Sequence, residues 1–248
     1  MRSAHLAQVH LLIWSSMGIK ILPTGPLGVN TLVVPLAEDS VFVVDPASCA
    51  FSDDETVVTH YLTQEKLKLV AIVLTHGHFD HVAGLPFLHK TYPDIPILIH
   101  QEDAEMIGAN SGILQGNSLA QMGFSAFTPS VSNLPEPAAF LEDGKSLADC
   151  MGSFADGMTE PVKIALSEWE VLHTPGHTKG SCCLYNATQK LLVSGDTLFY
   201  QSWGRTDLYG GNETQIRQSL RRLGKIVTDD TKVYPGHDMY GFEFENLF

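Results

Sequence analysis

The chain contains 248 residues, of which 44% are hydrophobic and 17% charged, as expected for a folded protein with one large core or two small domains. A formal net charge of −13 disfavours nucleic acid as a partner, because binding to phosphates requires a basic surface. No apolar run approaches the roughly 20 residues that a membrane-spanning helix needs, so we expect no membrane partner.

The beginning of the chain differs in pattern from the rest. Residues 1–16 show no clear periodicity and no clear cleavage site for a signal peptide. We therefore expect an N-terminal extension at residues 1–16, followed by a single domain over residues 17–248.

The first half of this domain contains short apolar segments punctuated by Pro and Gly, which is typical of strands joined by short connections. We expect strands at residues 18–22, 31–36, 41–46, 69–76 and 95–100. The segment at 53–65 indicates a helix with Ser52 or Asp53 as its N-cap, and the segment at 80–92 indicates another helix that ends before Pro93.

The segment at about 108–160 is rich in Gly, Ser, Asn, Pro and Met, and it predicts a long insertion with little regular structure. A wall of the substrate site and a passive insertion are equally compatible with this composition. Beyond it we expect a helix at about 212–227 and strands at residues 162–166, 169–174, 182–186, 190–196 and 232–238. Two similar halves of this kind would give two packed sheets with helices outside.

The cysteines form no C-x-x-C motif, and they are Cys49, Cys150, Cys182 and Cys183. Reduced, mostly buried thiols are the expectation for such residues, which fits a cytoplasmic protein. The adjacent Cys182 and Cys183 are expected to point to opposite faces of one strand.

The segment LTHGHFDHVAG, residues 74–84, places three histidines and an aspartate directly after a buried strand. Buried His and Asp side chains cost free energy unless they have partners. His76 and His78 flank a single glycine at the strand end, so both rings can reach one metal ion. Asp80 and His81 follow on the turn into a helix, where they can serve a second metal ion.

Three more polar residues follow apolar strands in the same way. His177 lies in PGHT after WEVLHT, Asp196 ends KLLVSGD, and His237 lies near the end of KVYPGHD. Residues at strand ends can converge at one edge of a pair of sheets, and imidazole and carboxylate groups suit Zn, Fe and Mn. The pattern therefore predicts a metal site.

Together, H-x-H-x-D-H, PGHT, SGD and the C-terminal PGH resemble the metallo-β-lactamase fold over about residues 18–240. The resemblance implies an α/β protein, an αββα four-layer sandwich of two mixed sheets flanked by helices, with metals at one edge of the sheets. It also implies two sets of ligands joined by a bridge: His76, His78 and His177 for the first metal, Asp80, His81 and His237 for the second, and Asp196 shared between them.

The stretch at 195–212, GDTLFYQSWGRTDLYGGN, looks like the glyoxalase II-like (hydroxyacylglutathione hydrolase-like) branch of that family. The implied activity is hydrolysis of a small-molecule thioester by a hydroxide that bridges two divalent metals, with zinc as first choice and iron or manganese as alternatives. Asp80 would orient the hydroxide and Asp196 would bridge the metals. The main class of β-lactamases resembles the chain less, because a Cys stands there in place of Asp196.

Other functions remain open at this point. The same stretch also resembles persulfide dioxygenases, which use a single iron, and a lactonase or other ester hydrolase is a further alternative. A metal-bearing binding module is disfavoured by the full set of ligands. In GRTD, Arg205 and Asp207 are expected to form an ion pair that fixes a loop, and the alternative is that Arg205 binds a substrate carboxylate. The helical C-terminal domain that grips glutathione in glyoxalase II enzymes has no counterpart before Phe248.

Overall fold

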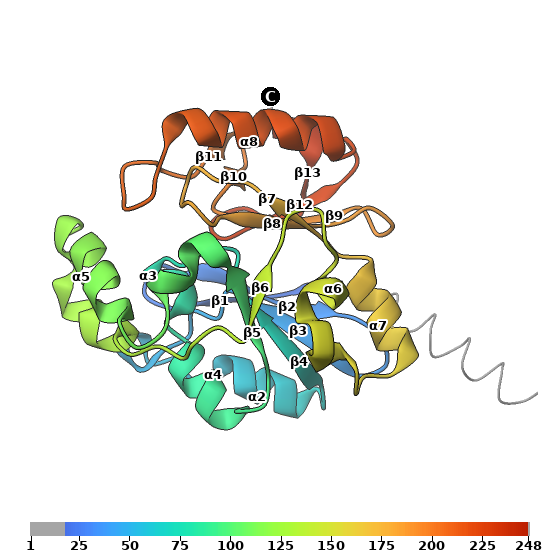
Figure 1. Cartoon of the computed structure of the whole chain (residues 1–248), viewed down its shortest axis with the longest axis horizontal. Helices are drawn as coiled ribbons and strands as arrows, with labels where there is room; N and C mark the ends of the chain where they lie inside the picture. The colour runs from blue at the N-terminus through green and yellow to red at the C-terminus, as the bar shows by residue number, and fades with distance from the viewer. Residues whose placement is uncertain (1–17, 248) are drawn as a thin grey trace, which may run out of the picture.

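Two mixed β-sheets stack face to face, and helices cover their outer faces (Figure 1). The structure is a computed structural model that describes residues 18–247, so the extension expected at residues 1–16 lies outside the described residues. Between residues 18 and 247, no helix combines the length and the apolar character that crossing a membrane would require. The αββα four-layer arrangement expected from the sequence is confirmed.

The first sheet contains six strands in sequence order, antiparallel from β1 to β3 and parallel from β3 to β6. The strand bounds are β1 Lys20–Thr24, β2 Val29–Pro35, β3 Ser40–Val44, β4 Lys68–Val73, β5 Ile97–His100 and β6 Ala139–Leu141. The second sheet has the order β13-β12-β9-β8-β7, in which only the β12–β9 pair is parallel. Its strands are β7 Glu170–His173, β8 Cys182–Asn186, β9 Leu191–Gly195, β12 Lys232–Pro235 and β13 Phe242–Glu243. A separate short hairpin joins β10 Leu198–Phe199 to β11 Ser202–Trp203.

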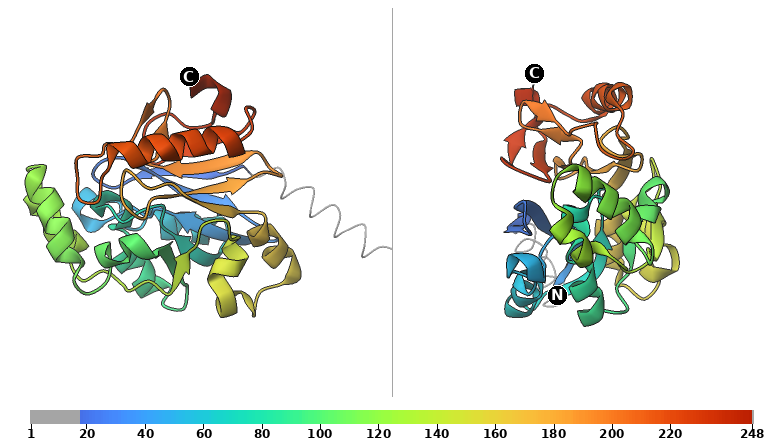
Figure 2. Two further views of the ribbon diagram at one scale, coloured as in Figure 1. Left: turned by 45° about the horizontal axis from the view of Figure 1, so that its top comes forward. Right: turned by 90° about the vertical axis from the view of Figure 1, so that its left-hand side faces the viewer.

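The helices differ in length, and α8 is the longest of those described (Figure 2). The α-helices are α2 Val57–Gln64, α3 Phe79–Val82, α4 Leu85–Thr91, α5 Ser111–Gln121, α6 Leu147–Met151, α7 Glu160–Ser167 and α8 Glu213–Ile226. The 3₁₀ helices are η1 Ala50–Ser52, η2 Gln101–Met106, η3 Ser125–Val131, η4 Gly152–Ala155 and η5 Phe244–Leu247.

Alternation along the buried strands divides the core into three layers. Phe42 and Val44 of β3 face the second sheet, whereas Val41 and Val43 face α2 and α4 on the other side of the first sheet. Both faces of the strand are therefore apolar, which explains the continuous hydrophobic run in its sequence. The outer face of the second sheet packs on the apolar face of α8.

The cysteines behave as expected. All four are buried free thiols, and Cys182 packs between the sheets while Cys183 faces α8. Burial raises the pKa of the Cys183 thiol to about 11. These thiols therefore act as small apolar core residues.

The strand expected at 162–166 is wrong, because this segment belongs to α7. Val162 and Leu166 are buried one helical turn apart, whereas Ile164 between them is 54% exposed. A strand would have placed all three side chains on one face. Pro161 in the first turn also suits a helix start.

The expectation of little regular structure in 108–160 is also wrong. This segment contributes α5, η3, α6 and η4, and its strand β6 pairs in parallel with β5 at the edge of the first sheet. Leu119 and Phe127 are fully buried and anchor α5 and η3 to the outer core of that sheet. Polar composition concealed these anchors because they are widely spaced in the sequence.

Two helices in the first half have other bounds than expected. Neither Ser52 nor Asp53 caps α2, which begins at Val57 after a separate 3₁₀ turn. The helix expected at 80–92 is divided into α3 and α4 at Gly84, where a Cβ atom would lie 2.7 Å from the Pro46 carbonyl oxygen. This close approach of two backbone segments requires glycine.

Candidate metal centre

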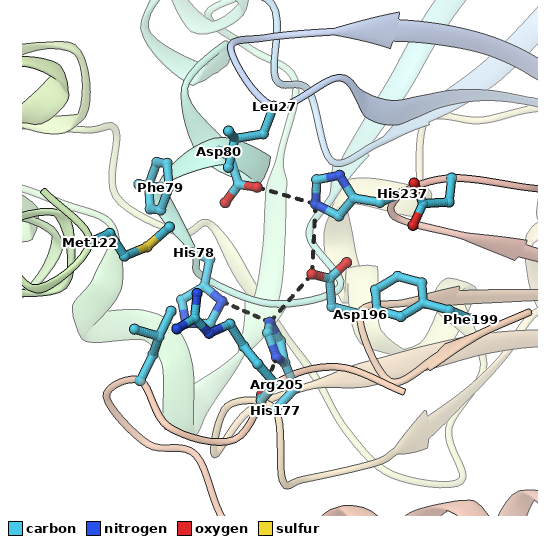
Figure 3. Close-up of a pocket in the computed structure, with 12 residues that line it drawn as sticks. Leu27, His78, Phe79, Asp80, Met122, His177, Asp196, Phe199, Arg205 and His237 are labelled. Carbon is cyan, nitrogen blue, oxygen red and sulfur yellow. Dashed lines mark hydrogen bonds and ion pairs between the residues drawn. The ribbon is translucent and has the colours of Figure 1, made fainter. Parts of the chain in front are cut away.

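The polar residues that follow the strands meet at one edge of the two sheets (Figure 3). His76 and His78 lie in the loop between β4 and α3, and His78 is the N-cap of α3. From the second sheet, His177 follows β7, Asp196 follows β9 and His237 follows β12. Parallel β9 and β12 bring the last two loops side by side.

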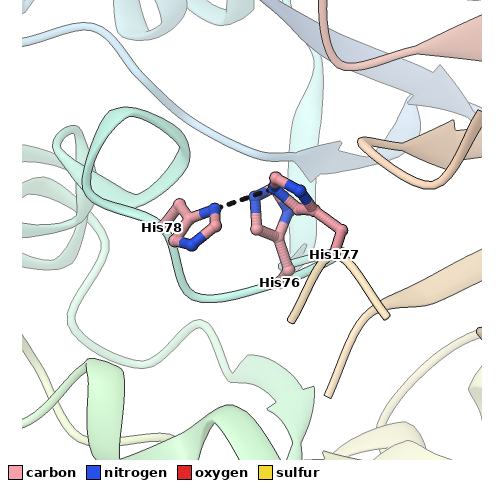
Figure 4. A group of neighbouring side chains, drawn as sticks. All are labelled: His76, His78 and His177. Carbon is pink, nitrogen blue, oxygen red and sulfur yellow. Dashed lines mark hydrogen bonds between the residues drawn. The ribbon is translucent and has the colours of Figure 1, made fainter. Parts of the chain in front are cut away.

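The first cluster consists of His76, His78 and His177, whose ligand atoms lie within 4.8 Å of one another (Figure 4). His78 Nδ1 lies 2.8 Å from His177 Nε2. Within residues 18–247, the buried Nε2 atoms of His76 and His78 have no hydrogen-bond partner. Burial and neighbouring imidazoles lower the pKa of His76 well below its ordinary value and that of His78 to about 3. These rings are therefore neutral, which is the form that binds metal ions.

The second cluster consists of Asp80, His81 and His237, again with ligand atoms within 4.8 Å of one another. His237 Nε2 lies 3.2 Å from Asp80 Oδ2 and 3.2 Å from His81 Nε2. Burial opposes protonation of His81, but the carboxylates of Asp196 and Asp80 outweigh it and raise the pKa of His81 well above its ordinary value. Burial is likewise outweighed at His237, whose pKa is raised by its hydrogen bond with Asp80.

Asp196 lies between the two clusters. Its Oδ2 atom is 3.5 Å from His177 Nε2 and 3.7 Å from His237 Nε2, and its Oδ1 atom is 3.4 Å from His81 Nε2. Oδ1 is buried and has no hydrogen-bond partner in the described part of the chain. Burial disfavours its negative charge, but the surrounding histidines, His81 foremost, lower the pKa of Asp196 well below its ordinary value. An ionised carboxylate with an unpaired buried oxygen, surrounded by several imidazoles, is a donor set that suits a divalent cation.

Asp45 supports the second cluster and was missed by the sequence reasoning. His81 donates from Nδ1 to Asp45 Oδ2 at 2.9 Å, which leaves Nε2 directed at the cluster. The backbone N–H and the hydroxyl of Thr75 donate to the same carboxylate at 2.7 and 2.6 Å. A carboxylate in this position fixes the tautomer and orientation of a metal-binding histidine. The sequence pattern could have identified Asp45, because this residue directly follows an apolar strand, as Asp196 does.

Asp103 and Gln115 support the first cluster, and no sequence pattern indicated either of them. The Asp103 carboxylate accepts hydrogen bonds from Gly77 N at 3.0 Å, Thr178 Oγ1 at 2.6 Å and Gly180 N at 2.7 Å. Gln115 Nε2 donates to the Gly77 carbonyl oxygen at 2.6 Å. Gly77, between His76 and His78, is therefore held at both its N–H and its C=O group.

Asn30 of β2 positions the loop that carries His237. Its side chain donates to the carbonyl oxygens of Pro235 at 3.0 Å and Asp238 at 3.2 Å, and its backbone N–H donates to Gly236 O at 2.7 Å. The first sheet thus fixes a loop of the second sheet.

Arg205 forms the ion pair with Asp207 that was expected from the sequence. Its Nε and Nη2 atoms donate to the two oxygens of Asp207 at 2.7 and 2.8 Å. The carbonyl oxygen of Arg205 also accepts a hydrogen bond from His177 Nδ1 at 2.7 Å. Arg205 therefore orients His177 through its backbone, leaving Nε2 of that ring free for the first cluster.

A pocket of about 350 Å³ opens beside the clusters. Its lining residues are Leu27, His78, Phe79, Asp80, Met122, His177, Asp196, Phe199, Arg205, Leu208, His237 and Asp238. Met122 belongs to the segment at 108–160, so this segment forms part of the pocket wall. Because the pocket reaches residues of both clusters, a ligand there would contact both candidate metal positions.

A family model described as "Metallo-beta-lactamase superfamily" matches residues 24–237. Among curated relatives, the "Probable metallo-hydrolase YqgX" of Bacillus subtilis is 30% identical over 222 residues, or 87% of this chain and 88% of that protein. A "Hydroxyacylglutathione hydrolase" of Pectobacterium carotovorum is 28% identical over 201 residues, which cover 81% of this chain but 58% of that protein.

Solved structures give the same fold. The BLEG-1 B3 metallo-β-lactamase is 28% identical, with a TM-score of 0.71 over 89% of this chain and 92% of that chain. TTHA1623 in a di-iron-bound form is also 28% identical, with a TM-score of 0.64 over the same shares of the two chains.

Proposed function

The chain belongs to the metallo-β-lactamase superfamily, and from this premise we propose that it is a dinuclear metal-dependent hydrolase whose substrate is a thioester. The observation that carries the proposal is the position of Asp196, whose carboxylate faces His177 of the first cluster and His81 of the second. A carboxylate shared by two sets of ligands is suited to bridge two nearby metal ions.

In this proposal the chain provides two sets of ligands and one bridge, namely His76, His78 and His177, then Asp80, His81 and His237, and Asp196 between them. Zinc is the first choice for both positions, with iron or manganese as alternatives, because imidazole and carboxylate ligands accept all three. When bound, such ions lower the pKa of water to about 7 and polarise a carbonyl oxygen.

The residues around the centre have separate tasks. Asp45 and the Arg205 carbonyl hold His81 and His177 with their Nε2 atoms directed inward. Asp80 lies in the pocket wall beside His237, where its carboxylate accepts a hydrogen bond from the attacking water and orients it toward the substrate carbonyl. A thiolate is a good leaving group, so a thioester needs no strong general acid in this pocket.

The named relatives support hydrolysis more strongly than any particular thiol. One is named a probable metallo-hydrolase and another a hydroxyacylglutathione hydrolase. Because the chain spans 58% of the second protein, glutathione recognition is not carried over by that similarity. We therefore propose a thioester of unspecified thiol, and neither nucleic acid nor a membrane as partner. We also propose a cytoplasmic location, because all four cysteines are buried free thiols.

Metal analysis of anaerobically purified protein, paired with activity assays in the absence of oxygen, tests the proposal. The substrates are simple thioesters, S-D-lactoylglutathione, lactones and a β-lactam. We expect close to two metal ions per chain and thioester hydrolysis that continues without oxygen. A single iron per chain, with oxygen consumed in the presence of glutathione persulfide, would identify a dioxygenase instead. Faster turnover of lactones or of the β-lactam than of every thioester would also contradict the proposal.

A further inference from the structure

The pocket has apolar walls around its polar floor. Leu27, Phe79 and Met122 lie on one side of the clusters, and Phe199 lies on the other side (Figure 3). These residues come from the β1–β2 turn, α3, the end of α5 and β10, so several separate segments supply apolar groups to one cavity. Such a lining is typical of a site for the apolar part of a small ligand.

Leu27 is informative because of where it lies. It is 46% exposed at a turn between two strands, and it also lines the pocket. An apolar ligand in the pocket would therefore cover part of the exposed apolar surface of this side chain.

The charged residues of the pocket also favour an uncharged ligand. Arg205 is the only Lys or Arg that lines the described pocket, and its guanidinium already binds both oxygens of Asp207. Asp238, the one acid in the lining outside the two clusters and their bridge, adds negative charge. The charge of Arg205 is therefore already balanced by Asp207, and the other charged residue outside the clusters and their bridge is acidic, so these two side chains offer a substrate carboxylate little net attraction.

We propose that the acyl group of the substrate is an uncharged hydrocarbon chain, bound between Leu27, Met122 and Phe199. This inference rests on the proposed thioester hydrolysis and specifies the substrate class of that reaction. The volume of about 350 Å³ lies near the lower end of ordinary ligand pockets, so it suits a chain of short to medium length.

The test is a series of thioesters that share one thiol, N-acetylcysteamine, and differ only in the acyl group. The acetyl, butyryl, hexanoyl and octanoyl esters vary the length of the acyl chain. The lactoyl ester carries a hydroxyl group. The succinyl ester has the same number of carbons as the butyryl ester, with a carboxylate in place of the terminal methyl group. Each buried methylene is expected to raise kcat/KM by roughly fourfold until the pocket is full. The succinyl ester should react more slowly than the butyryl ester.

Variants of the apolar lining residues test whether these residues cause the preference for longer acyl chains. Met122→Gln and Leu27→Gln should each make kcat/KM rise less with every added methylene. The reason is that the acyl chain of the substrate then lies against a polar amide. The matched control is Ile113→Gln, which changes an apolar residue of α5 that is 67% exposed and does not line the pocket. This control should keep the full chain-length dependence, and melting temperatures show whether all three variants fold.

The outcomes separate the two proposals. Rates that stay level or fall with chain length, or an unchanged dependence in both Met122→Gln and Leu27→Gln, would overturn the apolar-acyl inference while leaving thioester hydrolysis intact. A fully metal-loaded protein that hydrolyses S-D-lactoylglutathione but no member of the series would overturn the inference alone. One that hydrolyses no thioester of either kind would overturn the proposed function, and this inference with it.

Discussion

Replacing Asp103 by asparagine tests whether a carboxylate that touches no candidate ligand governs the first metal position. The side chain is 1% exposed in η2, and it joins the loop of His76 and His78 to the loop of His177. Asparagine keeps the size but puts an N–H₂ group where one oxygen accepted hydrogen bonds. One of the N–H donors, Gly77 or Gly180, then faces another donor.

The expected magnitude follows from these contacts. Losing one hydrogen bond to a charged group costs about 1.5–3 kcal/mol. Burial raises the pKa of Asp103, so ionisation of this carboxyl already carries a desolvation penalty, and the lower half of that range applies. Asp103→Ala would instead leave the N–H groups of Gly77 and Gly180 without this partner, at about 1–3 kcal/mol each, while the Thr178 hydroxyl keeps Ser181 Oγ as a partner; this loss is a large part of a total stability that is typically about 5–15 kcal/mol. Asparagine is therefore the more informative variant.

Two measurements are needed for Asp103→Asn. Urea unfolding of the metal-free protein should show the loss of stability, and titration with Co²⁺ should show metal affinity about 10- to 100-fold lower with an altered absorption spectrum. Asp149→Asn is the matched control, because this exposed carboxylate accepts hydrogen bonds from Ser146 in the α6 capping box, outside the pocket. It should leave Co²⁺ binding unchanged. Wild-type affinity and spectrum in Asp103→Asn would refute the positioning role.

Three further predictions concern the centre itself. Asp196→Ala should lower turnover by orders of magnitude while the metal-free protein keeps its melting temperature within a few degrees, and near-normal turnover would exclude the bridging role. Because carboxylates raise the pKa of His81 and His237, protons compete with metal there, so Zn²⁺ affinity should fall as pH decreases from 8 to 6. In the metal-free protein these raised pKa values favour the fold below the ordinary histidine pKa and their contribution is lost as pH rises, whereas the lowered pKa values of His76 and His78 contribute with the opposite sign. The metal titration is therefore the decisive measurement, and Zn²⁺ affinity that does not fall between pH 8 and pH 6 would contradict the assignment. Gly236→Ala should reduce metal content, because its Cβ would overlap the Asp196 carboxylate and lie 2.6 Å from the His81 ring.

The strands were largely predictable because their residues satisfy two requirements at once. Segments such as β3 are β-branched and apolar on both faces, so local preference and burial indicate the same structure. The segment at 162–166 shows where this fails. Its large apolar residues stand at every second position, which fits a strand, whereas packing against α6 and the inter-sheet core favours a helix with Ile164 left outside.

The candidate ligands and their supports differ in how far the sequence could identify them, and the reason is chemical. Metal binding needs rare residue types at short fixed spacings, so H-x-H-x-D-H indicates its chemistry before any fold is known. A residue that holds a ligand loop in place needs only a hydrogen-bonding group at the right position, and almost any polar residue can provide one. Gln115 is recognisable only from its bond to Gly77, which is 38 residues away in the sequence, and Asp103 only from its bond to Gly180, 77 residues away. Because the supports fix the ligand loops from distant segments, the geometry of the centre depends on the whole fold.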